Sequence, residues 1–365
     1  MEVDRSYALI HLDNVLNNYL ELKKLVGDRD VMAVVKADAY GHGSIPISRH
    51  LEANGCKYFA VASIEEAIEL REGGIKGEIL IFGRTSPENF KYLSRYDLIQ
   101  TVYSEEYAGL LAESSLEFRI HLNIDTGMSR FGFYLHKHED LFKVANTIER
   151  INGFENLNLE GIYTHFADSD DPSSDFCATQ FSIFSELLDE LKRRGIGPLL
   201  KHAANSAATL AYPNTYLDMV RVGIAMYGYP PRHTSANLLP VMEVFSKVSS
   251  VRLVTESDTV SYGRTYHPNH KEKIATVAIG YADGYNRLLS NDDYLMWKNH
   301  KLPVIGRVCM DAIMIKIDGL NIRDGDFVEV FGLTKKMESM CEKLRTIPYE
   351  ILCAVSKRVK RIYEK

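Results

Sequence analysis

The sequence predicts an α/β fold, a parallel (β/α)8 TIM barrel followed by a second, mainly β domain. From residue 31 to about 222, short β-branched and apolar runs alternate with segments of helical period, which is typical of a barrel with a parallel sheet. After Gly228, prolines at 230, 231 and 240 interrupt the chain, and most later segments have strand composition. At about 150 residues per domain, the chain length also indicates two domains.

The barrel strands are predicted at eight places: 31–35, 58–62, 79–82, 98–102, 118–123, 159–163, 199–202 and 219–222. Helical signals stand between them. Ser63 and Glu66 have the spacing of a capping box, in which Glu66 reaches back to the amide of Ser63, and Gly73 ends that helix. Ser104 is expected to cap the next helix, and 180–194 is helical in period.

The second domain is predicted from strands that glycine turns separate. The strands are expected at 244–254, 274–279, 302–308, 313–317 and 327–331, with a helix at 335–344. Asp-Gly pairs at 283–284, 318–319 and 324–325 mark turns. The opening strand, 7–12, is expected to join this domain. The predicted boundaries are therefore 10–235 for the barrel and 236–365, together with 1–9, for the β domain.

Composition excludes several classes of protein. Charged residues are 25% of the chain, the net charge is −6 and the pI is about 6.1, so no basic surface for nucleic acid or anionic membrane is indicated. No apolar run approaches the roughly 18 residues of a membrane span, and the charged start MEVDRSYALI has no signal-peptide core. Five widely spaced cysteines without a CxxC pair favour a reducing, cytoplasmic location.

Polar residues at the carboxyl ends of barrel strands form the active sites of this fold. Lys36 directly follows the apolar run that ends the first predicted strand. Burial disfavours an ammonium group and lowers its pKa, which makes a nucleophilic amine suited to a Schiff base. The alternative is a lysine whose stem packs at the barrel mouth while its ammonium group reaches solvent.

The ends of the seventh and eighth strands favour a phosphate group, because barrels often bind one there. Asn205 and Ser206 stand at a helix start in HAANSAATL, and the backbone amides of Gly223 and Ile224 are unobstructed in RVGIAMYG. A Schiff-base lysine beside a phosphate site indicates pyridoxal 5'-phosphate (PLP), and Arg221 is placed to meet its pyridine nitrogen.

A metal site is the competing interpretation of the same region. It would be built from two histidines and nearby carboxylates, His165, His202, Asp168, Asp170 and Asp171. Lys36 and Arg221 at the same barrel mouth argue against it, because they would repel a cation.

Several long segments in a fixed order resemble those of the alanine racemases, over essentially the whole chain. The segments are VVKADAYGHG (34–43), NIDTGMSRFGF (123–133), THFADSD (164–170), HAANSAA (202–208), RVGIAMYG (221–228), VSYGRTY (260–266), IGYADGY (279–285), GRVCMD (306–311) and IPYEILC (347–353). The chain also resembles the catalytic modules of membrane-anchored serine/alanine racemases of vancomycin-resistance clusters, and its start would suit an excised module.

The resemblance implies the cofactor, the site residues and a homodimer. Lys36 and Tyr262 would be the catalytic bases, Lys36 on the D face and Tyr262 on the L face of the substrate. Substrate contacts would come from Arg130, Tyr281, Met310 and Asp311. The cofactor ligands would be Lys36, Tyr40, Arg130, His165, Asn205, Ser206, Arg221, Gly223, Ile224 and Tyr349. Tyr262, Tyr281 and Met310 would face Lys36 of the partner subunit.

One departure from the family concerns Asn123. Many members have there a lysine that becomes carbamylated and restrains the arginine, and asparagine cannot be carbamylated. Arg130 is then expected to be held by Asn123, by Asp125 or by a bound anion. The implied activity is PLP-dependent racemisation of a small amino acid, alanine first and serine second, for peptidoglycan precursors.

Three other functions stay open at this point. A PLP decarboxylase of similar architecture would supply a cysteine where this chain has Ser261-Tyr262-Gly263. A non-catalytic PLP carrier would lack the second domain. A Schiff-base aldolase would use Lys36 without any cofactor.

Overall fold

The structure is a computed structural model that describes residues 3–365, and these form two compact units. The barrel unit comprises Asn14–Ala39 and Ser44–Leu239. The β unit comprises residues 3–13, Tyr40–Gly43 and Pro240–Lys365. Residues 1 and 2, which the sequence assigned to the β domain, lie outside the described residues. Each unit is presented by itself below.

The barrel unit contains the predicted parallel barrel. Its strands pair side by side in the order β5, β4, β3, β2, β10, β9, β8 and β6, and a further pairing of β5 with β6 closes the sheet. The strands are β2 (Asp30–Val34), β3 (Tyr58–Val61), β4 (Glu78–Ile81), β5 (Ile99–Val102), β6 (Phe118–Asp125), β8 (Leu157–Thr164), β9 (Leu200–His202) and β10 (Met219–Val222). The prediction of a (β/α)8 barrel is confirmed. The short strand β7 (Phe133–Tyr134) was not predicted, because two residues have no measurable periodicity.

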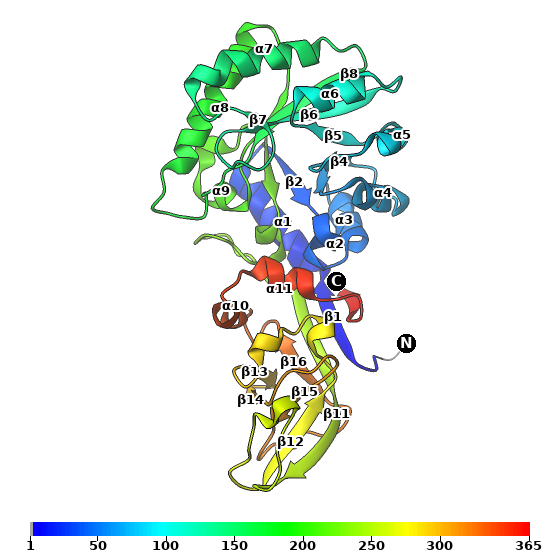
Figure 1. Cartoon of the computed structure of the whole chain (residues 1–365), viewed down its shortest axis with the longest axis vertical. Coiled ribbons are helices and arrows are strands. Elements are labelled where there is room, and N and C mark those ends of the chain that lie inside the picture. Colours follow the sequence, from blue (N-terminus) through cyan, green and yellow to red (C-terminus); the bar gives the residue numbers. More distant parts are fainter. Residues whose placement is uncertain (1–2) are drawn as a thin grey trace. The chain divides into compact units, whose positions relative to one another are not determined.

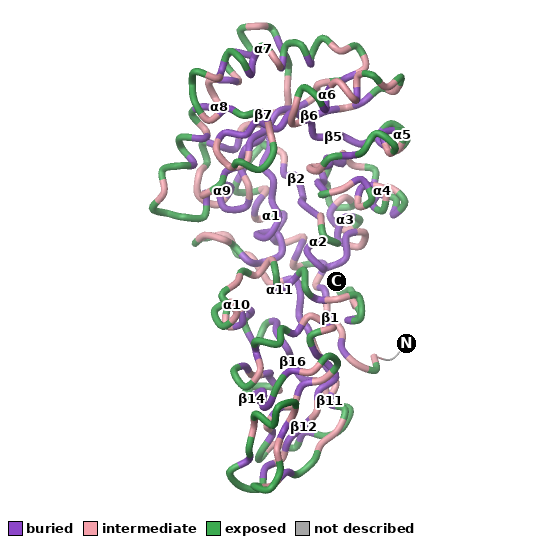
Figure 2. Tube along the Cα trace, viewed as in Figure 1, coloured by how far each residue is buried: buried purple, intermediate pink, exposed green. Residues whose placement is uncertain are grey.

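Helices cover the outside of the barrel, as Figure 1 shows for α4, α5, α7 and α8. They are α1 (Leu12–Val26), α3 (Ser44–Ala53), α4 (Ile64–Glu72), α5 (Phe90–Arg95), α6 (Glu105–Ala112), α7 (Leu141–Asn152), α8 (Phe176–Arg193) and α9 (Ser206–Ala211). Short 3-10 turns are η1 (Pro87–Asn89), η2 (His138–Asp140), η3 (Pro213–Thr215) and η4 (Ile224–Tyr227). In α7 the buried residues recur at helical spacing from Leu141 through Val144 and Ile148, so one face packs on the strands, which are buried in Figure 2.

Serine side chains cap two barrel helices. The hydroxyl groups of Ser63 and Ser104 both accept amide hydrogen bonds from the first turns of α4 and α6, as predicted. The other half of the capping box is wrong. The carboxylate of Glu66 bonds the amides of Ala62 and Ala37, and not that of Ser63. Ala37 follows the neighbouring strand β2, where the chain leaves the ladder, and its amide therefore needs an acceptor.

The β unit is built on a sheet with the order β12, β15, β14, β13, β16, β11, β1 and β17, and β12 also pairs with β11. Its strands are β1 (Ser6–His11), β11 (Met242–Val254), β12 (Glu272–Val277), β13 (Tyr294–Trp297), β14 (His300–Ile305), β15 (Ile313–Lys316), β16 (Phe327–Phe331) and β17 (Lys360–Glu364). The first strand pairs antiparallel with β11 and parallel with β17. The predicted Asp-Gly turns are present, with positive φ at Gly284, Gly319 and Gly325.

Two strands and a helix boundary in this unit differ from expectation. β13 and β17 were not predicted; β17 is an edge strand of largely charged, exposed residues, so it lacks an apolar alternation. The last helices are α10 (Glu338–Leu344) and α11 (Pro348–Ala354). α10 begins three residues later than predicted because the backbone of Lys335 is bonded outside the helix: its amide donates to Glu329 Oε1 at 2.8 Å, and its carbonyl oxygen accepts from the amide of Gly332 at 2.9 Å.

Within residues 3–365, no helix combines the length and the apolar composition that crossing a bilayer requires.

Candidate active site

Lys36 opens a turn of left-handed helix. The strand β2 ends at Val34, and α2 (Lys36–Tyr40) follows it with φ values of 52 to 53° at Ala37, Asp38 and Ala39. A side chain in this conformation costs roughly 1–2 kcal/mol per residue relative to the right-handed form. Such strain persists only where surrounding contacts enforce it, and it concentrates at functional sites. The half-buried Lys36 therefore precedes a left-handed turn that other contacts in the fold must stabilise.

Two carboxylates hold this turn. Glu66 Oε1 accepts the amide of Ala37 at 2.7 Å. Asp38 Oδ1 accepts the amide of Ser44 at 2.7 Å and so fixes the start of α3. The turn is thus held by one carboxylate of its own, that of Asp38, and by one from the neighbouring helix α4, that of Glu66.

Arg221, on β10, is a buried cation whose acceptors are neutral. Only 3% of its surface is exposed. It donates to the carbonyl oxygens of Thr164 at 2.9 Å and Ala203 at 3.1 Å. It also meets Nδ1 of His202 at 2.9 Å and Nδ1 of His165 at 3.1 Å. A buried guanidinium surrounded by neutral acceptors favours an electron-rich or anionic ligand group.

The direction of these bonds fixes the proton positions on two histidines. Arginine can only donate, so Nδ1 of both His165 and His202 must accept. His202 then carries its proton on Nε2, which donates to Nδ1 of His121 at 3.0 Å. The ring of Tyr163 stacks on His202, with centroids 4.7 Å apart, and also lies under the Arg221 guanidinium at 5.0 Å.

All three histidines are held neutral. Burial, followed by the charges of Arg119 and Arg221, lowers the pKa of His121 to about 3. Burial and Arg221 also lower the pKa of His165 and of His202 well below the usual range. Burial lowers the pKa of Arg221 to about 10, so its guanidinium stays charged at neutral pH.

This arrangement bears on the competing metal interpretation. The Nδ1 lone pairs of His165 and His202 both accept hydrogen bonds from Arg221 and so are not free to ligate a metal. Asp171 is exposed and binds Ser173 within its own loop. The charges of Lys36 and Arg130 add to that of Arg221 around His165, and three cations favour an anionic ligand.

The predicted phosphate residues lie at the start of α9 and after β10. Asn205 is the N-cap of α9, and its side chain accepts from the amide of Ala208 at 2.9 Å. Ser206 is buried, and its hydroxyl accepts from the amide of Gly223 at 2.9 Å. Ile224 begins η4. The structure therefore brings Ser206 and Gly223 into direct contact, with Asn205 and Ile224 as their chain neighbours.

Arg130 lies in an exposed loop that Asn123 and Asp125 organise. Asn123 Nδ2 donates to the carbonyl oxygen of Phe131 at 3.0 Å. Asp125 Oδ1 accepts the amides of Gly127, Met128 and Ser129 at 2.9 to 3.0 Å. Burial opposes ionisation of Asp125, but these amides and His136 outweigh it and lower its pKa. Both side chains thus hold the main chain of the Arg130 loop.

In the β unit, the predicted substrate residues gather around the loop 306–311. Ser261, which precedes Tyr262, has φ 68° and ψ −177°, a region almost restricted to glycine. Its hydroxyl donates to the carbonyl oxygen of Arg307 at 2.5 Å. The amide of Tyr281 donates to Cys309 O at 3.1 Å. Asp311, at the end of this loop, accepts from Arg358 at 2.7 Å.

The large side chains of this group are exposed. Tyr262 is 69% exposed, Met310 51% and Tyr281 44%. Gly280 explains how the Tyr281 segment approaches the loop so closely, because a Cβ there would lie 2.3 Å from Cys309 O. The remaining predicted ligands, Tyr40 and Tyr349, lie together in the same unit with ring centroids 5.9 Å apart.

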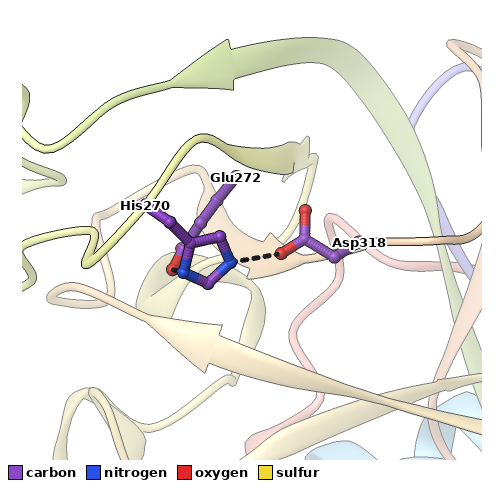
Figure 3. Close-up of side chains that lie close together, drawn as sticks. All are labelled: His270, Glu272 and Asp318. Atoms are coloured by element: carbon purple, nitrogen blue, oxygen red, sulfur yellow. Dashed lines mark ion pairs between the residues drawn. The ribbon is translucent and has the colours of Figure 1, made fainter.

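A separate polar cluster on the β unit, drawn in Figure 3, has the composition of a metal site. His270, Glu272 and Asp318 bring three potential ligand atoms within 4.8 Å of one another. However, Lys316 Nζ already lies 2.9 Å from Glu272 and 3.5 Å from Asp318. An ammonium group in this position repels a cation, so the cluster is an ion-pair network.

Sequence reasoning missed three residues that the structure connects to the site. His121 and Tyr163 support His202 from neighbouring strands, and Glu66 clamps the Lys36 turn. A histidine inside an apolar strand was a usable signal for His121. The role of Glu66 was hidden because its spacing from Ser63 matches a local helix cap.

Comparison with known proteins agrees over the whole chain. Residues 10–231 match the family described as "Alanine racemase, N-terminal domain", and residues 241–363 match "Alanine racemase, C-terminal domain". "Alanine racemase 2" of Caldanaerobacter subterraneus subsp. tengcongensis is 40% identical over 99% of this chain and 95% of its own.

Solved structures agree in fold and in sequence. The alanine racemase of Clostridium difficile 630 superposes with a TM-score of 0.92 at 36% identity, covering 100% of this chain and 96% of its own. A Bartonella henselae alanine racemase "with covalently bound pyridoxal phosphate" has a TM-score of 0.88 at 29% identity, covering 99% and 100%. The chain therefore belongs to the alanine racemase family.

Proposed function

We propose that this chain is a PLP-dependent racemase that interconverts L- and D-alanine. The observation that carries the proposal is Arg221, a buried guanidinium held by neutral acceptors in the barrel unit that also contains Lys36. A decarboxylase-type site would instead favour an acidic partner for the pyridine nitrogen, since a protonated ring withdraws electrons more strongly. The family membership and the Bartonella henselae structure support the same cofactor.

The residues present suit PLP in charge and in chemistry. When bound, the cofactor withdraws electrons from the amino acid and acidifies its α-proton. Lys36 would attach to its aldehyde, and Arg221 would donate to its pyridine nitrogen. Arg130 would hold its phenolic oxygen. The phosphate would be bound by the hydroxyls of Ser206, Tyr40 and Tyr349 and the amides of Gly223 and Ile224, with Asn205 ordering the start of α9.

Racemisation requires a proton to leave one face of the α-carbon and another to arrive on the opposite face. Lys36 would move the proton on the D face and Tyr262 the proton on the L face. Tyrosine is a weak base at neutral pH, so it needs hydrogen-bond donors that stabilise its phenolate. In the proposed dimer His165 would supply one to Tyr262 of the partner protomer, since its Nδ1 accepts from Arg221 and its Nε2 therefore carries a proton.

The exposure of Tyr262, Tyr281 and Met310 supports a homodimer with shared sites. Exposed aromatic and methionine side chains are typical of surfaces that another protein covers. In the proposed dimer, Tyr262 of one protomer would face Lys36 of its partner. Tyr281, Met310 and Asp311 would border the substrate, whose carboxylate Arg130 would bind.

Alanine is the proposed main substrate, because Tyr262, Tyr281 and Tyr349 would crowd the shared site of the proposed dimer and leave little room for long side chains. Serine is the second, since a pocket rejects one added hydroxyl weakly, by about 10²-fold. The proposed role of the enzyme is to supply D-amino acids for peptidoglycan precursors in the cytoplasm. We also propose that it is related to the racemases of vancomycin-resistance clusters.

Cofactor attachment and substrate assays test the proposal directly. Purified protein should be yellow, and borohydride should fix the cofactor on the peptide that contains Lys36. L-alanine and L-serine should then be assayed side by side for their D-enantiomers and for amine products. Labelling of another lysine would refute the assigned attachment site. Release of carbon dioxide without racemisation would favour the decarboxylase alternative.

A further inference from the structure

Glu66 joins two neighbouring strand ends at the barrel mouth. Its Oε1 accepts the amide of Ala37, and its Oε2 accepts the amide of Ala62, both at 2.7 Å. Ala37 follows β2 and Ala62 follows β3, and these strands pair in parallel with Val34 beside Ala60. Glu66 itself lies in the first turn of α4. One carboxylate therefore links the ends of two strands to the helix that follows the second.

The bond to Ala37 acts directly on the geometry of Lys36. The amide of Ala37 belongs to the peptide plane that also contains the carbonyl group of Lys36. Fixing that plane restrains the ψ angle of Lys36, and with it the direction in which the lysine side chain leaves the backbone. This plane also begins the left-handed turn, where Ala37, Asp38 and Ala39 all have φ near 53°.

Without a hydrogen bond that holds Ala37, the right-handed conformation would be lower in energy for this turn. L-residues avoid the left-handed region, and Ala37 and Asp38 are exposed, so burial does not hold these two residues in it. A charge-assisted hydrogen bond is about twice as strong as a neutral one. The carboxylate of Glu66 is thus suited to hold Ala37 in a conformation that its side chain disfavours.

We propose that Glu66 is a positioning residue that aims the Lys36 amine by holding the Ala37 peptide in the left-handed turn. The inference rests on the proposed role of Lys36 in cofactor attachment. It assigns to Glu66 a task that differs from helix capping, because the cap of α4 is already provided by the Ser63 hydroxyl.

Amide hydrogen exchange of the cofactor-free protein tests the clamp without any activity. We expect slow exchange in the peptide that contains Ala37 and a loss of that protection, by about tenfold, in Glu66→Ala. Glu65→Ala is the matched control, because Glu65 is an exposed carboxylate in the same helical turn. Its exchange at Ala37 should equal that of the wild type.

Cofactor capture then tests positioning. PLP should be added to the cofactor-free proteins, and borohydride should quench the reaction at intervals to measure the rate at which Lys36 is labelled. Glu66→Ala should be slowed by about tenfold or more, because a small misplacement of a reacting group costs that much. Glu65→Ala should match the wild type.

A rescue variant separates positioning from general stability. Glycine enters the left-handed region without the penalty of a side chain, so Ala37→Gly should compensate for the lost clamp. Glu66→Ala/Ala37→Gly should label Lys36 at least about threefold faster than Glu66→Ala. Glu66→Gln, which keeps one acceptor oxygen, should fall between the wild type and Glu66→Ala, and it provides a folded variant if alanine is not tolerated.

The outcomes are distinguishable from failure of the proposed function. If the wild type does not attach PLP at Lys36, the proposed function fails, whereas the exchange result still reports on the clamp. If Glu66→Ala and Glu65→Ala behave alike in both exchange and labelling, the positioning role is refuted. Slowed labelling that Ala37→Gly does not improve at all would also overturn it, since the defect would then lie outside the turn.

Discussion

The two proposed catalytic bases stand in contrasting surroundings. Lys36 is half-buried in the barrel unit, where Glu66 clamps its turn and where Arg221 is 3% exposed in a network of neutral acceptors. Tyr262 belongs to the β unit and is 69% exposed. Its segment is nevertheless strained, with Ser261 held in a glycine-like conformation by a bond to Arg307 O.

The contrast indicates a division of labour. The barrel unit presents one buried cation, Arg221, among oriented histidines, which is suited to hold a charged cofactor. The β unit presents the exposed Tyr262 beside Ser261, whose strained conformation is held by the bond to Arg307 O. Strained backbone concentrates at functional sites, and exposed aromatic side chains are typical of surfaces that another protein covers.

The largest expected effect comes from removing the amine of Lys36. Lys36→Ala should lose covalent cofactor attachment and lower kcat by at least about 10⁴-fold, because both the attachment and one base disappear. Lys36→Arg is the matched control for charge, since it keeps a cation but has no primary amine. Both variants should lose borohydride fixation of the cofactor and show the same large loss of kcat. Activity in Lys36→Arg would contradict the assignment of Lys36 as the attachment site and base.

Removing the hydroxyl of Tyr262 should abolish the proposed L-face base and leave cofactor attachment at Lys36 intact. Tyr262→Phe should still attach PLP at Lys36, but racemisation should fall by about 10²–10⁴-fold in both directions. Exchange of the α-hydrogen with deuterated solvent should persist for D-alanine and fall sharply for L-alanine. Proton NMR of the two enantiomers measures this asymmetry, and equal exchange from both would refute the two-base assignment.

Mixing two inactive variants tests whether the halves come from different protomers. Lys36→Ala and Tyr262→Phe chains should recover activity after subunit exchange, because one site of each heterodimer has both bases. Random pairing limits the recovery to about one quarter of wild-type activity. Mass spectrometry should verify the heterodimer, and a verified heterodimer without activity would count against shared sites.

Acid should lower the free energy of unfolding of the barrel unit more than that of the β unit. His121, His165 and His202 have lowered pKa values in the folded barrel unit, so below pH 6.5 the unfolded chain binds more protons. The histidine contribution to stability is then fully present above about pH 6.5 and is lost as the pH falls below it, by roughly 1 kcal/mol per histidine at pH 5.5.

Two probes can follow this loss. Hydrogen exchange in the barrel strands should rise between pH 6.5 and 5.5. Fluorescence of the single tryptophan, Trp297, reports on the β unit and should change less. His121→Gln, which retains an acceptor for His202, should reduce the acid loss by about one histidine's share. The matched control His270→Gln alters an exposed histidine and should leave it unchanged.

Sequence patterns predicted the barrel well and the contacts between its strand ends poorly. Most barrel strands were predictable because they are short, largely buried runs between helical segments. Long-range partners were not. The bond of Glu66 to Ala37 and the bond of His121 to His202 join residues 29 and 81 positions apart. Such pairs depend on the register of parallel strands, which local periodicity does not contain. β17 escaped because an edge strand needs no apolar face.

The smallest expected effect concerns Asn123 and the loop of Arg130. Asn123 is buried, and its amide already donates to Phe131 O at 3.0 Å. An asparagine side chain has no amine that carbon dioxide can modify, so bicarbonate should leave kcat and KM for alanine unchanged in carbonate-depleted buffer. Asn123→Lys places an amine at this position and should make activity respond to bicarbonate if the carbamate forms there. Asn123→Met has a side chain of similar length to lysine but no amine. It should lose the bond to Phe131 O, and its activity should not respond to bicarbonate. A bicarbonate effect on the wild type, or a carbamate found in its intact mass near this loop, would show that another group supplies the negative charge. The loop would then depend on that charge, and not on the amide of Asn123, to hold Arg130 for the substrate.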